Sequence, residues 1–127
     1  MNFLDAHLVS DNGGLAVDLQ GMRLSLPPQQ GKKAEAYTNK NVVFGIRPED
    51  ILATPEKQSA YLTPIRATVE VLEPLGAEIV LELSYKGYAF TARMDPQMRA
   101  RMHDEIEVYF DMERVHLFDP QTEQAIL

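Results

Sequence analysis

The sequence has 127 residues, which is enough for one domain with a single modest core. Its 12 Lys and Arg residues face 19 Asp and Glu residues, and a net charge of -7 repels a phosphate backbone and disfavours nucleic-acid binding. Cysteine is absent, which excludes disulfides, thiolate metal sites and cysteine nucleophiles. No apolar run could span a bilayer, and the first ten residues do not resemble a signal peptide, so we expect a cytoplasmic chain without direct membrane insertion.

The first third of the chain predicts β-strands. Apolar residues expected to face inward recur at every second position: Leu15, Val17, Leu19, Met22, Leu24 and Leu26. The sequence "DNGG" at residues 11–14 predicts a hairpin turn before this region, because glycine accepts a positive φ without a Cβ penalty. Pro27 and Pro28 end the last of these strands, since proline cannot donate to a β-ladder.

Two polar segments rich in turn residues, 27–40 and 48–64, are expected to be surface connections. Between them, "VVFGI" at residues 42–46 predicts a buried strand. Arg47 precedes a proline and is therefore expected to be extended. Pro48, with Glu49 and Asp50 behind it, suits the first turn of a short helix.

The second half predicts further half-buried antiparallel strands. Their inward positions are Ala67, Val69, Val71, Ala77, Ile79, Leu81, Leu83, Tyr85, Tyr88, Phe90, Ala92, Met94, Ile106, Val108 and Phe110. "YKG" at residues 85–87 predicts another turn, and "DPQMRAR" at residues 95–101 predicts about two turns of helix with Asp95 as N-cap. The expected fold is all-β with one or two short helices, an OB-like Greek-key barrel with additional strands.

Sequence patterns for catalysis and cofactor binding are absent. There is no phosphate-binding loop, and His7, His103 and His116 do not have metal-ligand spacing. The serines lack the context of a nucleophile, and the glutamates alternate with core residues, as on a solvated sheet face. We therefore expect no catalytic, cofactor-binding or metal-binding residue, and no enzyme activity, in this chain.

Three stretches in a fixed order resemble one known family. They are "VVFGIRPEDI" from Val42, "VEVLEPLGAEIVLEL" from Val69 and "FDMERVHLFDPQTEQAI" from Phe110, and the opening "MNFL" agrees with them. Together they resemble the C-terminal domain of ATP-binding subunits of ABC sugar importers, the MalK-like and UgpC-like group.

The resemblance implies that residues 1–127 form a single OB-type regulatory domain of the kind called TOBE, with the ATPase domain absent from this chain. In the parent subunit, ATP and Mg would bind that ATPase domain. The implied partners are a second copy of the subunit, its own ATPase domain, the membrane-spanning importer subunits reached through that domain, and a regulatory protein. The resemblance also implies a peripheral place on the inner face of the cell membrane, and an imported solute of the carbohydrate or glycerol-phosphate type.

The same motifs supply candidate residues for contact with a partner domain or a second copy. They are Arg47, Pro48, Glu49, Glu73, Gly76, Glu113, Arg114, His116, Leu117 and Phe118. Three groups of residues have a structural alternative: Arg47 to Asp50 could simply end a strand, Pro74 and Gly76 could set a bend, and Leu117 and Phe118 could lie in the chain's own core.

Two other functions remain open from the sequence. One is a barrel that binds a small ligand or an oxyanion. The other, disfavoured by the negative charge, is an OB-fold nucleic-acid binder in which aromatic side chains stack on bases, with Tyr85, Tyr88, Phe90 and Tyr109 as the available rings.

Overall fold

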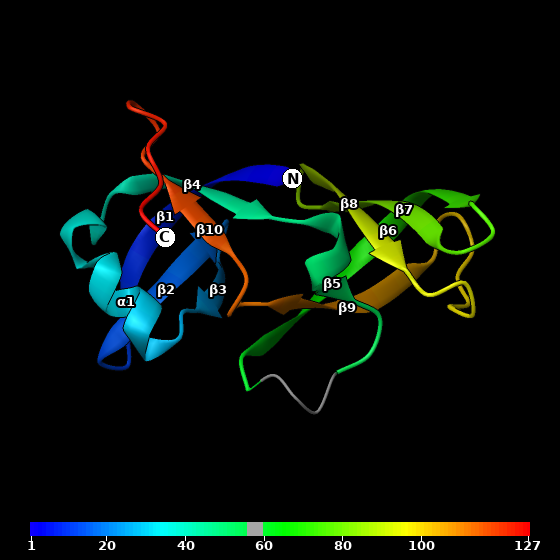
Figure 1. The fold of residues 1–127 in the computed structure, drawn as a ribbon, viewed down its shortest axis with the longest axis horizontal. Coiled ribbons are helices and arrows are strands. Elements are labelled where there is room, and N and C mark those ends of the chain that lie inside the picture. Colours follow the sequence, from blue (N-terminus) through cyan, green and yellow to red (C-terminus); the bar gives the residue numbers. More distant parts are fainter. Residues whose placement is uncertain (56–59) are drawn as a thin grey trace.

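A computed structural model of the chain describes residues 1–55 and 60–127. In this part of the chain, ten strands form two five-stranded sheets (Figure 1). The first sheet has the spatial order β10 (His116–Phe118), β4 (Asn41–Ile46), β1 (Asn2–Asp11), β2 (Gly14–Leu19) and β3 (Met22–Ser25). The second has the order β5 (Ile51–Leu52), β9 (Glu105–Asp111), β6 (Leu62–Pro74), β7 (Ile79–Tyr85) and β8 (Tyr88–Met94).

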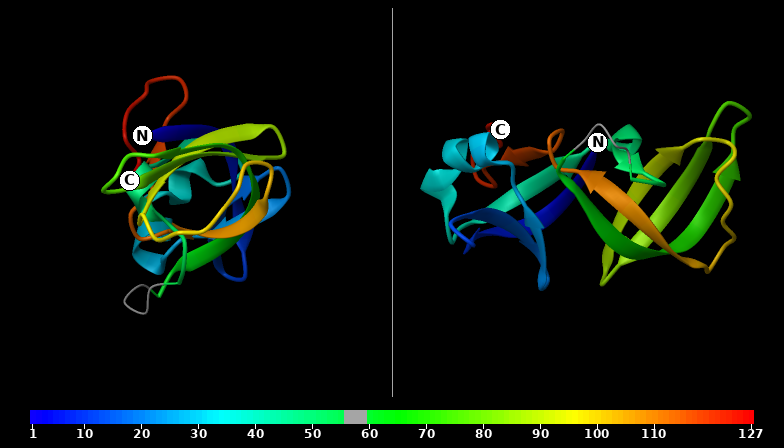
Figure 2. Two further views of the ribbon diagram at one scale, coloured as in Figure 1. Left: turned by 90° about the vertical axis from the view of Figure 1, so that its right-hand side faces the viewer. Right: turned by 90° about the horizontal axis from the view of Figure 1, so that it is seen from below.

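Neighbouring strands pair antiparallel in both sheets, and the two curled sheets lie end to end along the long axis of the molecule (Figure 1, Figure 2). The two sheets share one hydrophobic core. Phe44 of β4 stacks on Phe110 of β9 with ring centroids 6.0 Å apart, and Phe90 of β8 meets Phe110 edge-on at 5.4 Å. The expected all-β fold of OB type is confirmed.

The two predicted hairpin turns are also confirmed. Asn12 and Gly13 join β1 to β2 with φ values of 49° and 82°, and Lys86 and Gly87 join β7 to β8 with 45° and 86°. Two successive residues of positive φ give the turn the twist that antiparallel strands require. The dipeptides Asn-Gly and Lys-Gly therefore define the register of both hairpins.

One region predicted as a connection contains helices instead. The connection predicted for residues 27–40 contains α1 (Pro28–Lys33) and the 3-10 helix η1 (Glu35–Tyr37). Pro28 occupies the first turn, and Gly31 packs against Leu15 of β2, 3.9 Å from where a Cβ would lie. Burial against β2 therefore stabilises a helix that its polar sequence did not indicate.

The prediction of a helix at residues 95–101 was wrong. Asp95 accepts hydrogen bonds from the backbone N–H groups of Gln97 (2.8 Å, side chain) and Met98 (3.0 Å, backbone), which makes a single turn. Residues 98–101 then continue without helical structure. The side chain of Asp95 caps a turn here instead of starting a helix.

Two inward positions were also assigned incorrectly. Val71 is 47% exposed because β6 contains a bulge between Val69 and Val71, where the register with β7 shifts. The extra residue moves the next side chains to the opposite face, so that Leu72 packs against the core instead. Ala77 is exposed in the turn between β6 and β7. The remaining predicted inward residues are buried or half-buried.

Within the connection predicted for residues 48–64, the structure places the 3-10 helix η2 (Pro48–Asp50), strand β5 and the start of β6. Residues 56–59 of this connection lie outside the described residues.

Candidate functional site

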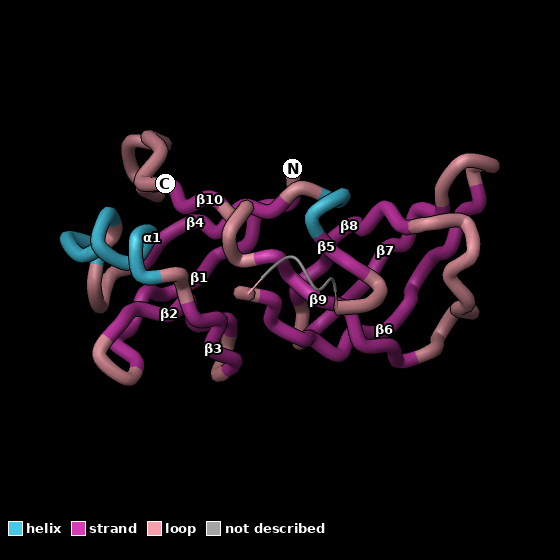
Figure 3. Tube along the Cα trace, turned by 60° about the horizontal axis from the view of Figure 1, so that its bottom comes forward, coloured by secondary structure: helices cyan, strands magenta, loops and turns pink. Residues whose placement is uncertain are grey.

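Within residues 1–55 and 60–127, the chain crosses between the two sheets twice, and two of the three sequence motifs contain these crossings. The first runs from the end of β4 through Arg47 and η2 into β5, and the second runs from the end of β9 at Asp111 to the start of β10 at His116. Arg47 is extended, with φ −76° and ψ 147°, and its carbonyl accepts the N–H of Asp50 at 2.9 Å. The expected extended Arg47 and short helix after it are confirmed, and Figure 3 shows η2 at the junction of the two halves.

Charged side chains of the two crossings surround Asp50, the buried member of η2. Burial raises the pKa of the Asp50 carboxyl; Arg114 and Arg47 act against this rise, while Glu49 and Asp111 add to it. The Arg114 guanidinium lies 3.8 Å from the Asp111 carboxylate, with 69% of the Arg114 side chain exposed. We call these five residues the crossing cluster.

Five of the sequence candidates therefore lie on the two crossings. They are Arg47, Pro48, Glu49, Glu113 and Arg114, and four of them are exposed while Pro48 is half-buried. The backbone carbonyl of Glu113 also accepts a hydrogen bond from the Gln30 amide at 3.0 Å, which ties the second crossing to α1.

Glu73 and Gly76 lie apart from these residues, in the hairpin between β6 and β7 at the far end of the second sheet (Figure 1). Both are exposed, and Gly76 has a φ of 82°, which a bend at this position requires. The structure does not bring them together with the crossing cluster.

The last three candidates form β10, which pairs with β4. Leu117 is completely buried in the core, so its side chain is not available to a partner. His116 and Phe118 are half-buried on the opposite face of the strand, with ring centroids 6.2 Å apart.

An apolar surface lies on the outer face of the first sheet, and we call it the outer patch: Met1, Phe3, Val43 and Phe118. Phe3 is 61% exposed, Met1 is 43% exposed, and the Phe3 ring meets Phe118 edge-on at 5.8 Å. Gly45 makes this packing possible, because a Cβ there would lie 2.8 Å from the Met1 sulfur and 3.0 Å from the Phe118 ring. Phe118 is among the contact residues predicted from the sequence, whereas Met1, Phe3 and Val43 are not.

Two observations in the sequence could have indicated the outer patch. Phe3 stands on the face of β1 that also carries Asp5, His7 and Val9, while Leu4, Ala6 and Leu8 alternate on the buried face. Gly45 is a glycine inside a strand, one residue before its end, and a glycine within a strand often marks a close approach of another group.

The four aromatic residues that were candidates for stacking on nucleic-acid bases do not form one exposed surface. Phe90 is 3% exposed and belongs to the core. Tyr88 is half-buried, and its hydroxyl donates to the backbone carbonyl of Asp5 at 2.8 Å. Tyr85 and Tyr109 alone do not make a stacking surface.

Across residues 1–55 and 60–127, no group of three or more His, Asp or Glu side chains is placed to hold a metal ion. No helix in the described part of the chain is both long and apolar enough to cross a membrane.

The fold and its exposed surfaces define an all-β module of OB type, and comparison with known protein families is consistent with this class. A family model described as "MalK OB fold domain" matches residues 1–51, and one described as "TOBE domain" matches residues 44–118. The chain belongs to the TOBE domain family, as represented in MalK-type ATP-binding subunits.

Several curated proteins are similar over almost the whole chain. The trehalose/maltose import ATP-binding protein MalK of Thermococcus litoralis is 38% identical over 130 residues, covering 99% of this chain and 34% of the relative. The oligosaccharides import ATP-binding protein MsmX of Bacillus subtilis is 35% identical, covering 99% of this chain and 34% of the relative. The sulfoquinovosyl glycerol transport ATP-binding protein SmoE of Agrobacterium fabrum is 31% identical, covering 99% of this chain and 33% of the relative. The chain thus spans about a third of the length of these relatives.

Proposed function

We propose that this chain is the regulatory and dimerisation part of the ATP-binding subunit of an ABC importer for a carbohydrate or glycerol-phosphate-type solute. The observation that carries the proposal is the similarity over 99% of the chain to subunits named for the import of trehalose, maltose and oligosaccharides. The chain would not itself hydrolyse ATP; ATP and Mg would bind elsewhere in the parent subunit.

The proposed partners are a second copy of the subunit, its ATPase domain, the membrane-spanning subunits reached through that domain, and a regulatory protein. This assembly would place the chain in the cytoplasm, at the inner face of the membrane. The exposed Phe3 ring and Met1 side chain of the outer patch support a protein contact, because covering apolar surface of this kind with a partner is energetically favourable.

A second interface has a physical purpose in an importer. Two nucleotide-binding domains that separate after each turnover reassociate faster if another contact keeps them together, since reassociation is then intramolecular at a high effective concentration. A molecule that binds one arrangement of the pair more tightly shifts the population toward it, by no more than its differential affinity. Neither role requires a catalytic residue.

The test is a full-length subunit compared with one that lacks this domain. We expect the deletion to weaken dimerisation in analytical ultracentrifugation and to abolish regulation of transport in vesicles. Normal dimerisation, transport and regulation without the domain would refute the proposal.

A point substitution tests the contact role of the outer patch. Phe3→Ser removes an exposed aromatic ring from the patch, and Val71→Ser removes an exposed apolar side chain from the second sheet as a matched control. We expect the first to impair dimerisation or transport coupling and the second to leave both unchanged. Equal effects of the two substitutions would count against a contact at the outer patch.

A further inference from the structure

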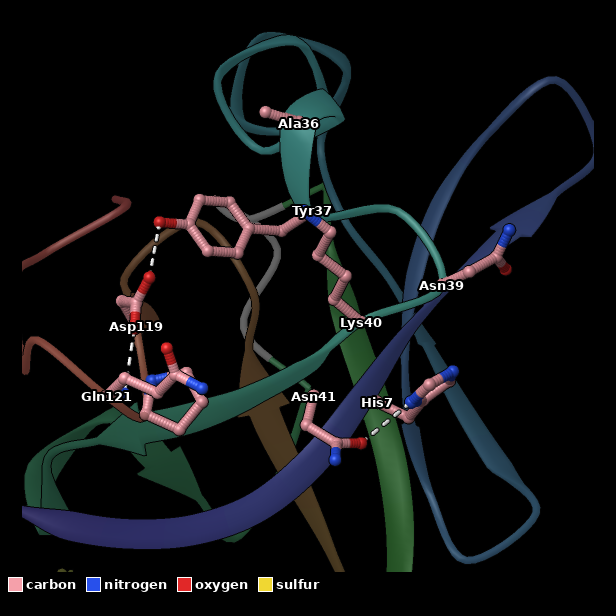
Figure 4. Close-up of a pocket in the computed structure, with 9 residues that line it drawn as sticks. His7, Ala36, Tyr37, Asn39, Lys40, Asn41, Asp119 and Gln121 are labelled. Atoms are coloured by element: carbon pink, nitrogen blue, oxygen red, sulfur yellow. Dashed lines mark hydrogen bonds between the residues drawn. The ribbon is translucent and has the colours of Figure 1, made fainter.

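A polar cleft of about 670 Å³ lies at one end of the first sheet, and none of its lining residues belongs to the crossing cluster. It adjoins the outer patch, because Asp119 and Pro120 also line the hollow beside Phe3 and Phe118. Three segments that are distant in sequence form it: His7 on β1, residues 36–41 from η1 to the start of β4, and residues 119–121 after β10 (Figure 4). Its volume is in the range of small-molecule sites, about 300 to 1,000 Å³.

Hydrogen bonds hold the walls of the cleft in place. The Tyr37 hydroxyl donates to Asp119 Oδ2 at 2.7 Å, while Asp119 Oδ1 accepts the backbone N–H groups of Gln121 (2.8 Å) and Thr122 (3.1 Å). These bonds, led by the one from Tyr37, lower the pKa of the Asp119 carboxyl. Walls fixed before binding reduce the entropy that a ligand must lose.

The other polar groups of the cleft have unused hydrogen-bonding capacity. Within the described residues, the side-chain amides of Asn39 and Gln121 make no hydrogen bond, and Asn41 uses only its Oδ1, 2.9 Å from His7 Nδ1. The Lys40 ammonium lies 5.8 Å from the centre of the Tyr37 ring. Each side-chain amide offers two donor hydrogens and an acceptor oxygen.

The charges of the cleft indicate what class of ligand it suits. Among the described residues that line the cleft, the charges of Lys40 and Asp119 are opposite and balance each other. An anion would lie beside the Asp119 carboxylate, in a chain of net charge -7. A cation would have to bind the Asp119 carboxylate. That carboxylate has about four lone-pair sites for hydrogen bonds, and three of them already accept one. Neutral hydroxyl groups both donate and accept, and they therefore match the three amides.

We propose that this cleft binds a neutral, polyhydroxylated carbohydrate through the side chains of Asn39, Asn41 and Gln121, with Lys40 and the Tyr37 ring beside it. The inference rests on the proposed function, and it gives the domain a small-molecule ligand in addition to its protein contacts. A carbohydrate that binds one arrangement of the subunits more tightly would regulate import by population shift.

The experiment measures binding to the chain of residues 1–127 itself. Backbone amide signals of the labelled chain are followed by NMR during titration with glucose, maltose, trehalose and sorbitol up to tens of millimolar. Sodium sulfate and glycine betaine serve as the charged comparison ligands. We expect saturable shifts at residues 36–41 and 119–121 with at least one carbohydrate, and none there with sulfate.

Substitutions with matched controls locate the site. Asn39 has a φ of 64°, so Asn39→Gly removes the amide without straining the backbone, and Asn12→Gly at φ 49° in the β1–β2 turn is its control. Gln121→Ala is paired with Gln97→Ala, an exposed amide at the far end of the second sheet. Loss of one hydrogen bond to the ligand should weaken binding about fivefold for each cleft variant and leave each control unchanged.

Several outcomes would overturn the inference. They are no saturable shift with any carbohydrate, shifts confined to other residues, binding equally weakened by the control variants, or preferential binding of sulfate or betaine in the cleft. None of these outcomes depends on dimerisation or transport, so failure here is distinguishable from failure of the proposed function.

Discussion

Asn2 connects the two sheets, and its removal gives the sharpest test of the structure. Its side-chain Nδ2 donates to the backbone carbonyls of Thr91 at 2.8 Å and Ile46 at 3.2 Å, and its Oδ1 accepts the Thr91 N–H at 2.8 Å. Thr91 lies on β8, the edge strand of the second sheet, so the amide of Asn2 pairs with this edge as a neighbouring strand would. Asn2→Ala removes all three hydrogen bonds.

The expected loss of stability follows from these bonds. Each contributes about 0.5 to 1.5 kcal/mol, and water replaces part of this at a half-buried edge, so we expect the free energy of unfolding to fall by about 2 kcal/mol. For a domain of this size, that corresponds to a decrease of about 6 to 10 °C in Tm. Urea and thermal unfolding followed by circular dichroism measure both quantities, and amide hydrogen exchange should show faster exchange at Thr91.

Two further variants sharpen this test. Asn2→Asp keeps an acceptor for the Thr91 N–H but places a carboxylate beside two carbonyl oxygens, so it should destabilise at least as much as Asn2→Ala at neutral pH. Asn41→Ala removes one exposed hydrogen bond to His7 and should be nearly neutral. If Asn2→Ala cost less than about 0.5 kcal/mol and left Thr91 exchange unchanged, the reasoning would be refuted.

Three other predictions concern the core, a turn and the crossing cluster. Leu117→Ala should cost about 2 to 5 kcal/mol in urea unfolding because the side chain is completely buried, and a value near zero would place Leu117 at the surface. His103 has a φ of 73°, so His103→Gly should be more stable than His103→Ala by about 1 kcal/mol; the reverse order would contradict this conformation. Burial raises the pKa of Asp50 in the folded chain, so the wild type loses stability as pH rises from the unfolded pKa of about 3.9 through the folded value. Asp50→Asn should therefore be more stable than the wild type at neutral pH, and a stability difference that does not shrink in acid would contradict the expectation.

Much of the sheet structure could be predicted because its causes are local. Alternation at period two reports which face of a strand is buried, and the inward positions in β2, β3, β8 and β9 follow from it. The turns at Asn12–Gly13 and Lys86–Gly87 depend on the backbone freedom of adjacent residues.

The errors arose where tertiary contacts outweigh local preference. The bulge in β6 depends on pairing with β7, and the sequence around Val71 continues the alternation without interruption. Helix α1 is stabilised by its contact with β2, whereas the better local start at Asp95 has only a single turn.

The candidate site, like the fold, could be predicted where it depends on local sequence and not where it depends on tertiary contacts. The order of the motifs indicated the two crossings, but Glu73 and Gly76 were grouped with them although they lie at the opposite end of the second sheet. Asn2 was missed because a sequence does not show which strand edges meet in space. Its role depends on the edge of β8, about 90 residues away in the chain.

The position of β1 suggests how a contact at one surface could affect the whole chain. This strand carries Phe3 of the outer patch, and it is joined to the second sheet on either side of that residue, through Asn2 to Thr91 and through the Asp5 carbonyl to the Tyr88 hydroxyl. A partner that displaces Phe3 must therefore strain both links or move the second sheet with the first. Because the core between the sheets is continuous and closely packed, moving the sheets together costs less than separating them. A partner that bound at the outer patch would therefore be expected to move both sheets as a unit.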